Sequence, residues 1–200
     1  IQKCLDLLQR MDNAPYEFVL RHQETDLKAI VGFKHRTFND TDALYFIAFL
    51  QHHYQRFNSL EDAFVQFMSP KDITVEKGLV GFQRYFTSLP YFPKRTGKHL
   101  ASPAMGSACK RLNMFLRWMV RKDEKGVDLG IWKAITPCQL VFPLDVHVER
   151  VARKLHLLRH PQTNWKAALE LTDFFRKISP EDPVQYDFAL FGLGLEGFAD

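Results

Sequence analysis

The clearest helical signal in this chain is Ser107-Ala108-Cys109-Lys110-Arg111-Leu112-Asn113-Met114-Phe115-Leu116-Arg117-Trp118-Met119-Val120-Arg121. Its apolar side chains recur three or four positions apart, at Cys109, Leu112, Phe115, Leu116 and Met119. This spacing places them on one face of an α-helix, whereas a half-buried strand would alternate apolar and polar residues. The stretch therefore predicts an amphipathic helix that buries one side.

The same helical period recurs along most of the chain. It appears from Leu5 to Met11, after a capped start at Asp40-Thr41-Asp42, and in residues 74–86, 145–157, 163–178 and 183–193. Two alternating segments joined by a hairpin turn are not found, so the sequence predicts no strand pair. We therefore expect an all-α protein of roughly eight to ten helices. Irregular chain is expected at 88–106 and at 123–144, with a short helix near Leu129 to Ala134 in the second.

Length and composition favour one globular domain. The chain has 200 residues, 46% of them hydrophobic and 25% charged, which is ordinary for a packed domain and too apolar for a disordered chain. We expect a single helical domain over residues 1–200, within which lobes 1–90 and 91–200 could form. The longest apolar runs, such as Leu44 to Leu50, are far shorter than the ~20 residues of a membrane span.

The cysteines indicate a reducing compartment. Cys4, Cys109 and Cys138 show no close pairing and cannot form a disulfide framework,. The chain opens at Ile1 inside an apparent helix, so we expect that a preceding segment has been trimmed.

Positive charge is concentrated in one part of the chain. Residues 91–125 contain nine basic and two acidic side chains, a net charge of +7 in a chain whose total is +4. The basic residues are Lys94, Arg95, Lys98, Lys110, Arg111, Arg117, Arg121, Lys122 and Lys125. Such a region can bind a phosphate backbone through counterion release. A solvated basic face with no polyanion partner explains the same pattern, and both interpretations stay open.

A second segment of interest reads Phe142-Pro143-Leu144-Asp145-Val146-His147-Val148-Glu149-Arg150-Val151-Ala152-Arg153. Pro143 favours an extended entry, and Asp145 then stands at the start of a helix, where a carboxylate caps the first turn. A structural cap is a sufficient explanation for Asp145 when the segment is taken alone.

This segment resembles the Pro-Val-Asp-Thr-His-Val-x-Arg-Val-Ala signature of the helix-hairpin-helix DNA glycosylases, the superfamily of endonuclease III and 8-oxoguanine glycosylase. The matching residues are Pro143, Asp145, His147, Val148, Arg150, Val151 and Ala152. The chain as a whole also resembles an uncharacterised bacterial branch of that superfamily, around Phe33 to Phe38 and Cys109 to Val120. The resemblance implies a two-lobed helical bundle with a helix-hairpin-helix element, and it makes Asp145 the catalytic carboxylate.

The hairpin itself departs from the superfamily pattern. In Ser102 to Arg111, Ala104 replaces the first hairpin glycine, and Ala108 stands at the usual lysine position. Gly106 and Ser107 could still offer backbone N–H groups to a phosphate. Lys110 falls close to the catalytic lysine of the archaeal 8-oxoguanine glycosylase branch, which also has an atypical hairpin. A phosphate-contacting or merely solvated Lys110 is the alternative.

The resemblance implies a base-excision repair glycosylase for a damaged base, such as an oxidised purine, flipped out of double-stranded DNA. Lys110 would form a Schiff base, which could add AP-lyase activity, and Asp145 would stabilise the sugar cation. The expected DNA contacts are Lys94, Arg95, Lys98, Gly106, Ser107, Arg111, His147 and Arg150. Trp118, Trp132 and Phe142 are candidates to stack on the base, with core packing as the alternative for each. A non-catalytic DNA-binding protein on the same scaffold is the alternative function, and a protein-interaction domain ranks third.

We expect no cofactor. No cysteine follows Cys138, so the four-cysteine iron–sulfur loop of endonuclease III is absent from the sequence. Metal-ligand spacing is also weak, because His52 and His53 are adjacent, and Pro161 follows the pair His156 and His160. The remaining expectations are a monomer that binds DNA and no membrane, in the cytoplasm at the nucleoid.

Overall fold

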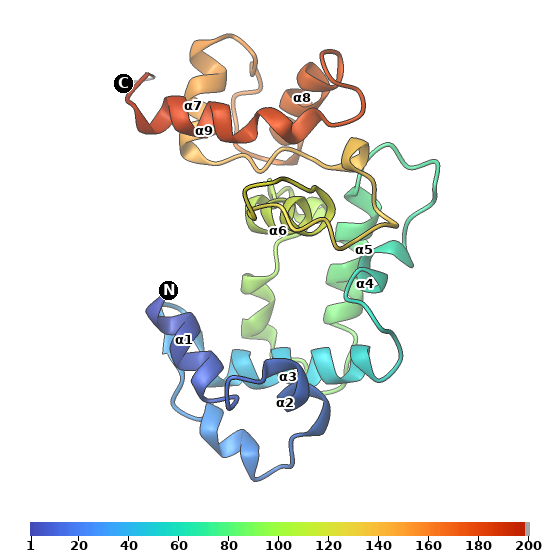
Figure 1. Cartoon of the computed structure of the whole chain (residues 1–200), viewed down its shortest axis with the longest axis vertical. Coiled ribbons are helices and arrows are strands. Elements are labelled where there is room, and N and C mark those ends of the chain that lie inside the picture. The colour runs from blue at the N-terminus through green and yellow to red at the C-terminus, as the bar shows by residue number, and fades with distance from the viewer. Residues whose placement is uncertain (199–200) are drawn as a thin grey trace. The chain divides into compact units, whose positions relative to one another are not determined.

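Helices make up most of the computed structural model, which describes residues 1–198 (Figure 1). These residues contain nine α-helices, five short 3₁₀ helices and one two-stranded sheet. The predicted all-α character is therefore confirmed at the level of secondary structure. No helix in this range is long and apolar enough to cross a membrane.

The chain divides into two compact units that are discontinuous in sequence. The first unit comprises Ile1–Ala63 and Arg84–Leu100, and the second comprises Phe64–Gln83 and the chain from Ala101 onward. The division falls within the short helix α4 (Asp62–Val65) and within α5 (Glu76–Phe86). These bounds differ from the contiguous lobes 1–90 and 91–200 that the sequence suggested.

The first unit is built around α3 (Asp40–Tyr54). Asn39 caps this helix, and Asp42 completes a capping box with it, so the helix is capped one residue before the predicted start. The other elements are α1 (Gln2–Gln9), α2 (Pro15–Arg21), the 3₁₀ helices η1 (Asp26–Ile30) and η2 (Lys94–His99), and the strands β1 (Lys34–His35) and β2 (Phe38–Asn39). One cluster of buried side chains joins them: Met11, Phe18, Ile30, Phe33, Ala43 and Ile47.

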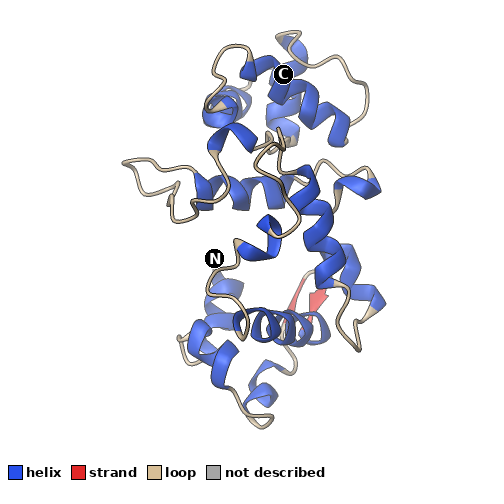
Figure 2. Cartoon of the chain, turned by 90° about the vertical axis from the view of Figure 1, so that its right-hand side faces the viewer, coloured by secondary structure: helices blue, strands red, loops and turns tan. Residues whose placement is uncertain are grey.

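The structure contains a strand pair that the sequence did not predict, and Figure 2 shows it in red. β1 and β2 pair antiparallel, with His35 opposite Phe38. Arg36 between them has a positive φ of 56°, as tight hairpin turns require,. Strands of two residues are too short to show an alternating pattern, so periodicity could not reveal them.

The second unit contains most of α5 together with α6 (Lys110–Val120), α7 (Val146–Lys154), α8 (Trp165–Arg176) and α9 (Asp187–Leu195). Short 3₁₀ helices lie between them: η3 (Pro103–Met105), η4 (Pro137–Gln139) and η5 (Pro183–Tyr186). Leu79, Leu116, Phe142, Val151 and Leu171 are almost completely buried. These side chains of α5, α6, α7, α8 and the chain before α7 therefore belong to the interior of the second unit.

The predicted short helix near 129–134 is wrong. Leu129 and Ile131 are exposed, whereas Gly130 and Trp132 are buried. This alternation is the period of extended chain, not of a helix. The N–H groups of Leu129 and Trp132 accordingly donate to carbonyl oxygens at the end of α6, those of Trp118 and Met119.

Helix α9 lies directly against α7 (Figure 1), and a glycine permits the close approach. A Cβ atom added at Gly194 would lie 2.7 Å from the Cβ and 3.0 Å from the backbone oxygen of His147. Because backbone cannot move aside cheaply, Gly194→Ala is expected to lower the free energy of unfolding by about 1–3 kcal/mol, measured by urea denaturation.

Gly192 provides the matched control on the same helix. A Cβ added there meets no atom within 4 Å, so Gly192→Ala should leave stability unchanged or raise it by up to about 1 kcal/mol. Equal losses in the two variants would contradict the packing explanation.

Candidate functional site

Two helix starts meet in the second unit. The Lys110 Nζ lies 3.2 Å from the Asp145 Oδ2, although 35 positions separate the two residues in sequence. The Lys110 side chain is 49% exposed, whereas that of Asp145 is only 7% exposed. The amine is thus reachable from solvent, and the carboxylate is held against the protein.

Asp145 combines a structural and a chemical role. Its backbone is extended, and its Oδ1 accepts a hydrogen bond of 2.8 Å from the Val148 N–H at the first turn of α7. The other oxygen, Oδ2, faces Lys110. The capping interpretation of the sequence is therefore confirmed, and it leaves one carboxylate oxygen for chemistry.

Lys110 is the first residue of α6. Cys109 before it has a left-handed backbone with φ 51°, which is uncommon for a residue other than glycine, asparagine or aspartate,. Burial raises the pKa of the Cys109 thiol to about 11, so this thiol stays protonated at neutral pH and is no competing nucleophile. The site therefore presents one nucleophilic candidate, the Lys110 amine.

The turn before α6 is tightly bonded within itself. Gly106 has φ 73°, and its N–H donates to the Pro103 oxygen at 2.8 Å. The Ser107 N–H donates to the Ser102 oxygen at 3.3 Å. The prediction that these two N–H groups hold a DNA phosphate is wrong for this conformation, because both are used inside the turn.

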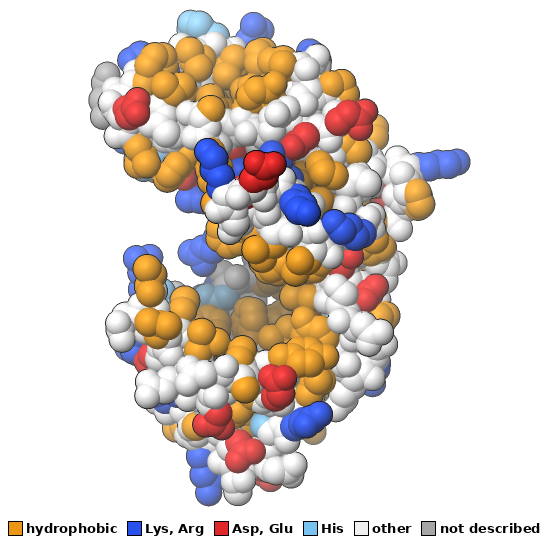
Figure 3. All heavy atoms as spheres, in the orientation of Figure 1, with side chains coloured by type: hydrophobic (Ala, Val, Ile, Leu, Met, Phe, Trp, Pro, Cys, Tyr) orange, Lys and Arg blue, Asp and Glu red, His pale blue; other side chains and the backbone are white. Residues whose placement is uncertain are grey.

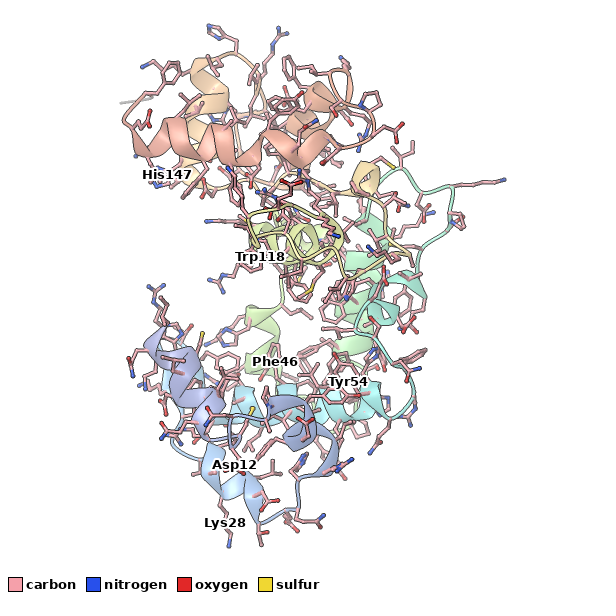
Figure 4. The ribbon with its side chains drawn as sticks, in the orientation of Figure 1. Asp12, Lys28, Phe46, Tyr54, Trp118 and His147 are labelled. Carbon is pink, nitrogen blue, oxygen red and sulfur yellow. The ribbon has the colours of Figure 1, made fainter. Side chains whose placement is uncertain are left out.

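Two of the three predicted stacking residues belong to the core. Trp132 is 6% exposed and packs edge-on against Phe115, and Phe142 is 0% exposed and stacks on Phe175 at 5.1 Å. Neither ring can stack on a base, so this prediction is wrong for both. Trp118, which is labelled in Figure 4, is 40% exposed on α6. It lies eight residues from Lys110, about 12 Å along the helix axis, and its stacking role stays a prediction.

The basic region of the sequence lies only partly at the surface. Arg117 and Arg121 are turned inward and bind carboxylates: Arg117 pairs with Asp187 at 2.5 Å and with Asp128 at 3.2 Å, and Arg121 pairs with Asp128 and Asp182. Figure 3 shows acidic side chains interspersed among the basic ones on the face that it presents. This network is not apparent in the sequence, because Asp182 and Asp187 lie more than 60 residues from their arginines.

Three predicted DNA contacts lie in the first unit, on η2. Lys94 and Lys98 are exposed. Arg95 binds the Asp42 carboxylate at 2.6 Å, and Asp42 also accepts a hydrogen bond from Thr96. Arg95 therefore ties η2 to the start of α3, while its side chain remains 39% exposed, and its contact with DNA stays a prediction.

The three remaining predicted contacts lie beside the two helix starts. Arg111 follows Lys110 and is exposed, and Arg150 is exposed on α7. The ring of His147, labelled in Figure 4, is half-buried and packs edge-on against Phe191 with centroids 5.6 Å apart. His147 therefore contributes to the contact between α7 and α9. In residues 1–198, no group of three or more His, Cys, Asp or Glu side chains is arranged to hold a metal ion.

Comparison with known proteins assigns the chain to a family. Residues 1–196 match the family described as "Protein of unknown function (DUF2400)". The match covers nearly the whole chain, so the protein belongs to this family. No curated protein and no solved structure matches it significantly.

Proposed function

We propose that this protein is a DNA base-excision repair glycosylase with a lyase step, in which Lys110 is the Schiff-base nucleophile and Asp145 the catalytic carboxylate. The observation that carries the proposal is the 3.2 Å separation of the Lys110 Nζ and the Asp145 Oδ2. The sequence resemblance to helix-hairpin-helix glycosylases named both residues independently of this geometry. Such an enzyme would act on chromosomal DNA, in the cytoplasm at the nucleoid.

The pair can perform the required chemistry. Asp145 takes a proton from Lys110, and the free amine attacks the C1′ of a flipped nucleotide. The glycosidic bond breaks, the base leaves with the bonding electrons, and it takes up the proton that Asp145 accepted, so Asp145 is a carboxylate again as positive charge develops on the sugar. One proton of the new C1′ ammonium then passes to the ring oxygen as the C1′–O4′ bond breaks, which gives a protonated imine between Lys110 and C1′. Loss of a C2′ proton then expels the 3′ phosphate by β-elimination, and water hydrolyses the imine.

Asp145 also has an electrostatic role in the proposal. Positive charge develops on the sugar as the base departs, and a nearly buried carboxylate stabilises it more strongly than one in water. The first turn of α7 holds this carboxylate in place through the Val148 N–H. An immobile charge needs little reorganisation during the reaction.

The test is borohydride trapping of the wild-type protein on duplex oligonucleotides that contain either 8-oxoguanine or an abasic site. A covalent adduct, absent on undamaged duplex, supports the proposal. Release of 8-oxoguanine identifies a glycosylase, and an adduct on the abasic duplex alone limits the activity to the lyase step. DNA binding without adduct or base release would replace the proposal with a non-catalytic DNA-binding protein.

Asp145→Asn separates the cap from the charge. The amide oxygen can still accept from the Val148 N–H, so stability should change by less than about 1 kcal/mol. The reaction should slow on the order of 100-fold or more, because the amide neither takes a proton nor balances the sugar cation. Single-turnover kinetics and urea denaturation measure the two effects. Asn164→Asp, at the cap of α8, is the control for a cap change elsewhere in the same unit.

A further inference from the structure

A buried amide joins the two segments that supply Lys110 and Asp145. Asn113 is 1% exposed and lies one turn after Lys110 on α6. Its Nδ2 donates to the Ala108 oxygen at 3.1 Å and approaches the Phe142 oxygen at 3.5 Å. The first oxygen precedes Lys110 by two residues, and the second precedes Asp145 by three.

The orientation of this amide follows from its partners. Both neighbours of Nδ2 are carbonyl oxygens, so the nitrogen must face them and the oxygen must point away. The Asn113 Oδ1 is buried and has no hydrogen-bond partner in the described part of the chain. An unpaired buried acceptor costs free energy, and packing alone would be served better by an apolar side chain of the same size.

The backbone has little conformational freedom between each carbonyl that Asn113 contacts and the reacting residue that follows it. Only Cys109, with its left-handed backbone, separates Ala108 from Lys110. Between Phe142 and Asp145 stand Pro143, whose ring fixes φ, and Leu144, whose N–H donates to the Phe142 oxygen at 2.9 Å,. A shift of either carbonyl would therefore displace a reacting group.

We infer that Asn113 is a positioning residue, which holds the Lys110 amine and the Asp145 carboxylate within reach of each other by bonding the segment before each. The catalytic part of this inference rests on the proposed function. The contacts themselves concern only the arrangement of the two segments.

The kinetic test uses Asn113→Leu and Asn113→Asp, neither of which has a side-chain N–H to donate. Each variant should form the borohydride-trapped adduct on abasic duplex at least tenfold more slowly in single turnover, with a Kd for that duplex within twofold of wild type. Asn113→Leu should slow the Asp145→Asn variant by a smaller factor than it slows the wild type, because the two changes share the Asp145 carboxylate but not the Lys110 amine. If Asn113→Leu does not fold, Asn113→Asp carries the same test.

Thr172→Val is the matched control. The Thr172 hydroxyl accepts from the Phe142 N–H at 3.0 Å and donates to the Ala168 oxygen, so its loss removes buried hydrogen bonds at the same segment without touching α6. Thr172 holds only the Phe142 segment and not the Ala108 segment, so Thr172→Val should slow trapping clearly less than Asn113→Leu does. An equal slowing in Thr172→Val and Asn113→Leu, or no slowing in either Asn113 variant, would overturn the inference.

A second readout does not depend on activity. Hydrogen exchange of the Val148 N–H, which donates to Asp145, reports whether the carboxylate is held. Exchange should be at least tenfold faster in Asn113→Leu than in wild type, and faster in Asn113→Leu than in Thr172→Val. If the wild-type protein forms no adduct, the proposed function fails, and this exchange alone decides the positioning role. Unchanged exchange in Asn113→Leu would refute it.

Discussion

Lys110→Ala is expected to abolish the covalent adduct with abasic duplex, a loss on the order of 10³-fold or more in trapping rate. In the proposed mechanism the Lys110 Nζ is the only protein atom that forms a bond to the sugar, at C1′. The Lys110 side chain is half exposed and stands at a helix start, so its removal should change the free energy of unfolding by less than about 1 kcal/mol. Gel analysis of the trapped complex, with mass spectrometry of the modified peptide, measures the result.

Lys110→Arg distinguishes a nucleophile from a phosphate contact. Arginine keeps the positive charge, but it does not lose its proton in proteins and cannot form the imine. The adduct should therefore vanish in Lys110→Arg while affinity for duplex DNA remains within a few fold. Lys166→Ala, which removes an exposed amine from α8 of the same unit, should trap at the wild-type rate. Adduct formation by Lys110→Arg would show that another amine reacts and that Lys110 is not the nucleophile.

Helices could be predicted from the sequence because a helix that buries one face needs apolar residues three or four positions apart. In α7 and α8 the apolar stripes agree with the buried faces, and Asp145 caps α7 as expected. In α6 the buried face is instead Asn113, Leu116, Arg117 and Val120, because two polar side chains find partners in the interior. The meeting of Lys110 with Asp145 was also anticipated, but from a family resemblance and not from spacing. A separation of 35 residues does not by itself indicate that the helix starts at Lys110 and Asp145 lie side by side.

The wrong predictions have a common physical origin, because each depends on which side chains lie next to one another in the folded protein. Trp132 and Phe142 are as suitable for stacking as for core packing until their surroundings are known. Arg117 and Arg121 are predicted to be surface residues because other basic residues lie near them in the sequence. In the structure, Asp128 and Asp187 accept the Arg117 guanidinium inside the protein. Asp187 is 70 residues from Arg117, and a partner at that separation leaves no local signature in the sequence.

That buried arginine gives the largest expected effect on stability. Arg117 is 2% exposed, binds Asp128 and Asp187, and lies 3.7 Å above the ring of Phe188. Arg117→Met keeps most of the apolar stem and removes the charge. The free energy of unfolding at pH 7 should fall by about 3–5 kcal/mol, because a buried carboxylate then lacks its partner. Arg121→Met is the control, and it should cost less because Arg121 is more exposed and Asp128 keeps Arg117.

The pH dependence identifies Asp187 as the affected carboxylate. Burial raises the pKa of Asp187 to about 6, although Arg117 lowers it. The folded protein therefore binds this proton more tightly than the unfolded chain does, and the contribution of Asp187 to stability declines as pH rises from about 4 through 6. Without Arg117 the pKa of Asp187 rises further, so the decline in Arg117→Met should be steeper and extend to higher pH.

Urea denaturation of Arg117→Met between pH 5 and pH 8 tests this explanation, with Arg117→Met/Asp187→Asn as the compensated variant. The double variant has no carboxylate to ionise at position 187, so it should be more stable than Arg117→Met at pH 8 and should lose the steep pH dependence. The comparison separates the cost of an unpaired charge from the cost of lost packing, because both variants lack the guanidinium. A double variant no more stable than Arg117→Met at pH 8 would show that packing around Phe188, and not the buried carboxylate, accounts for the loss.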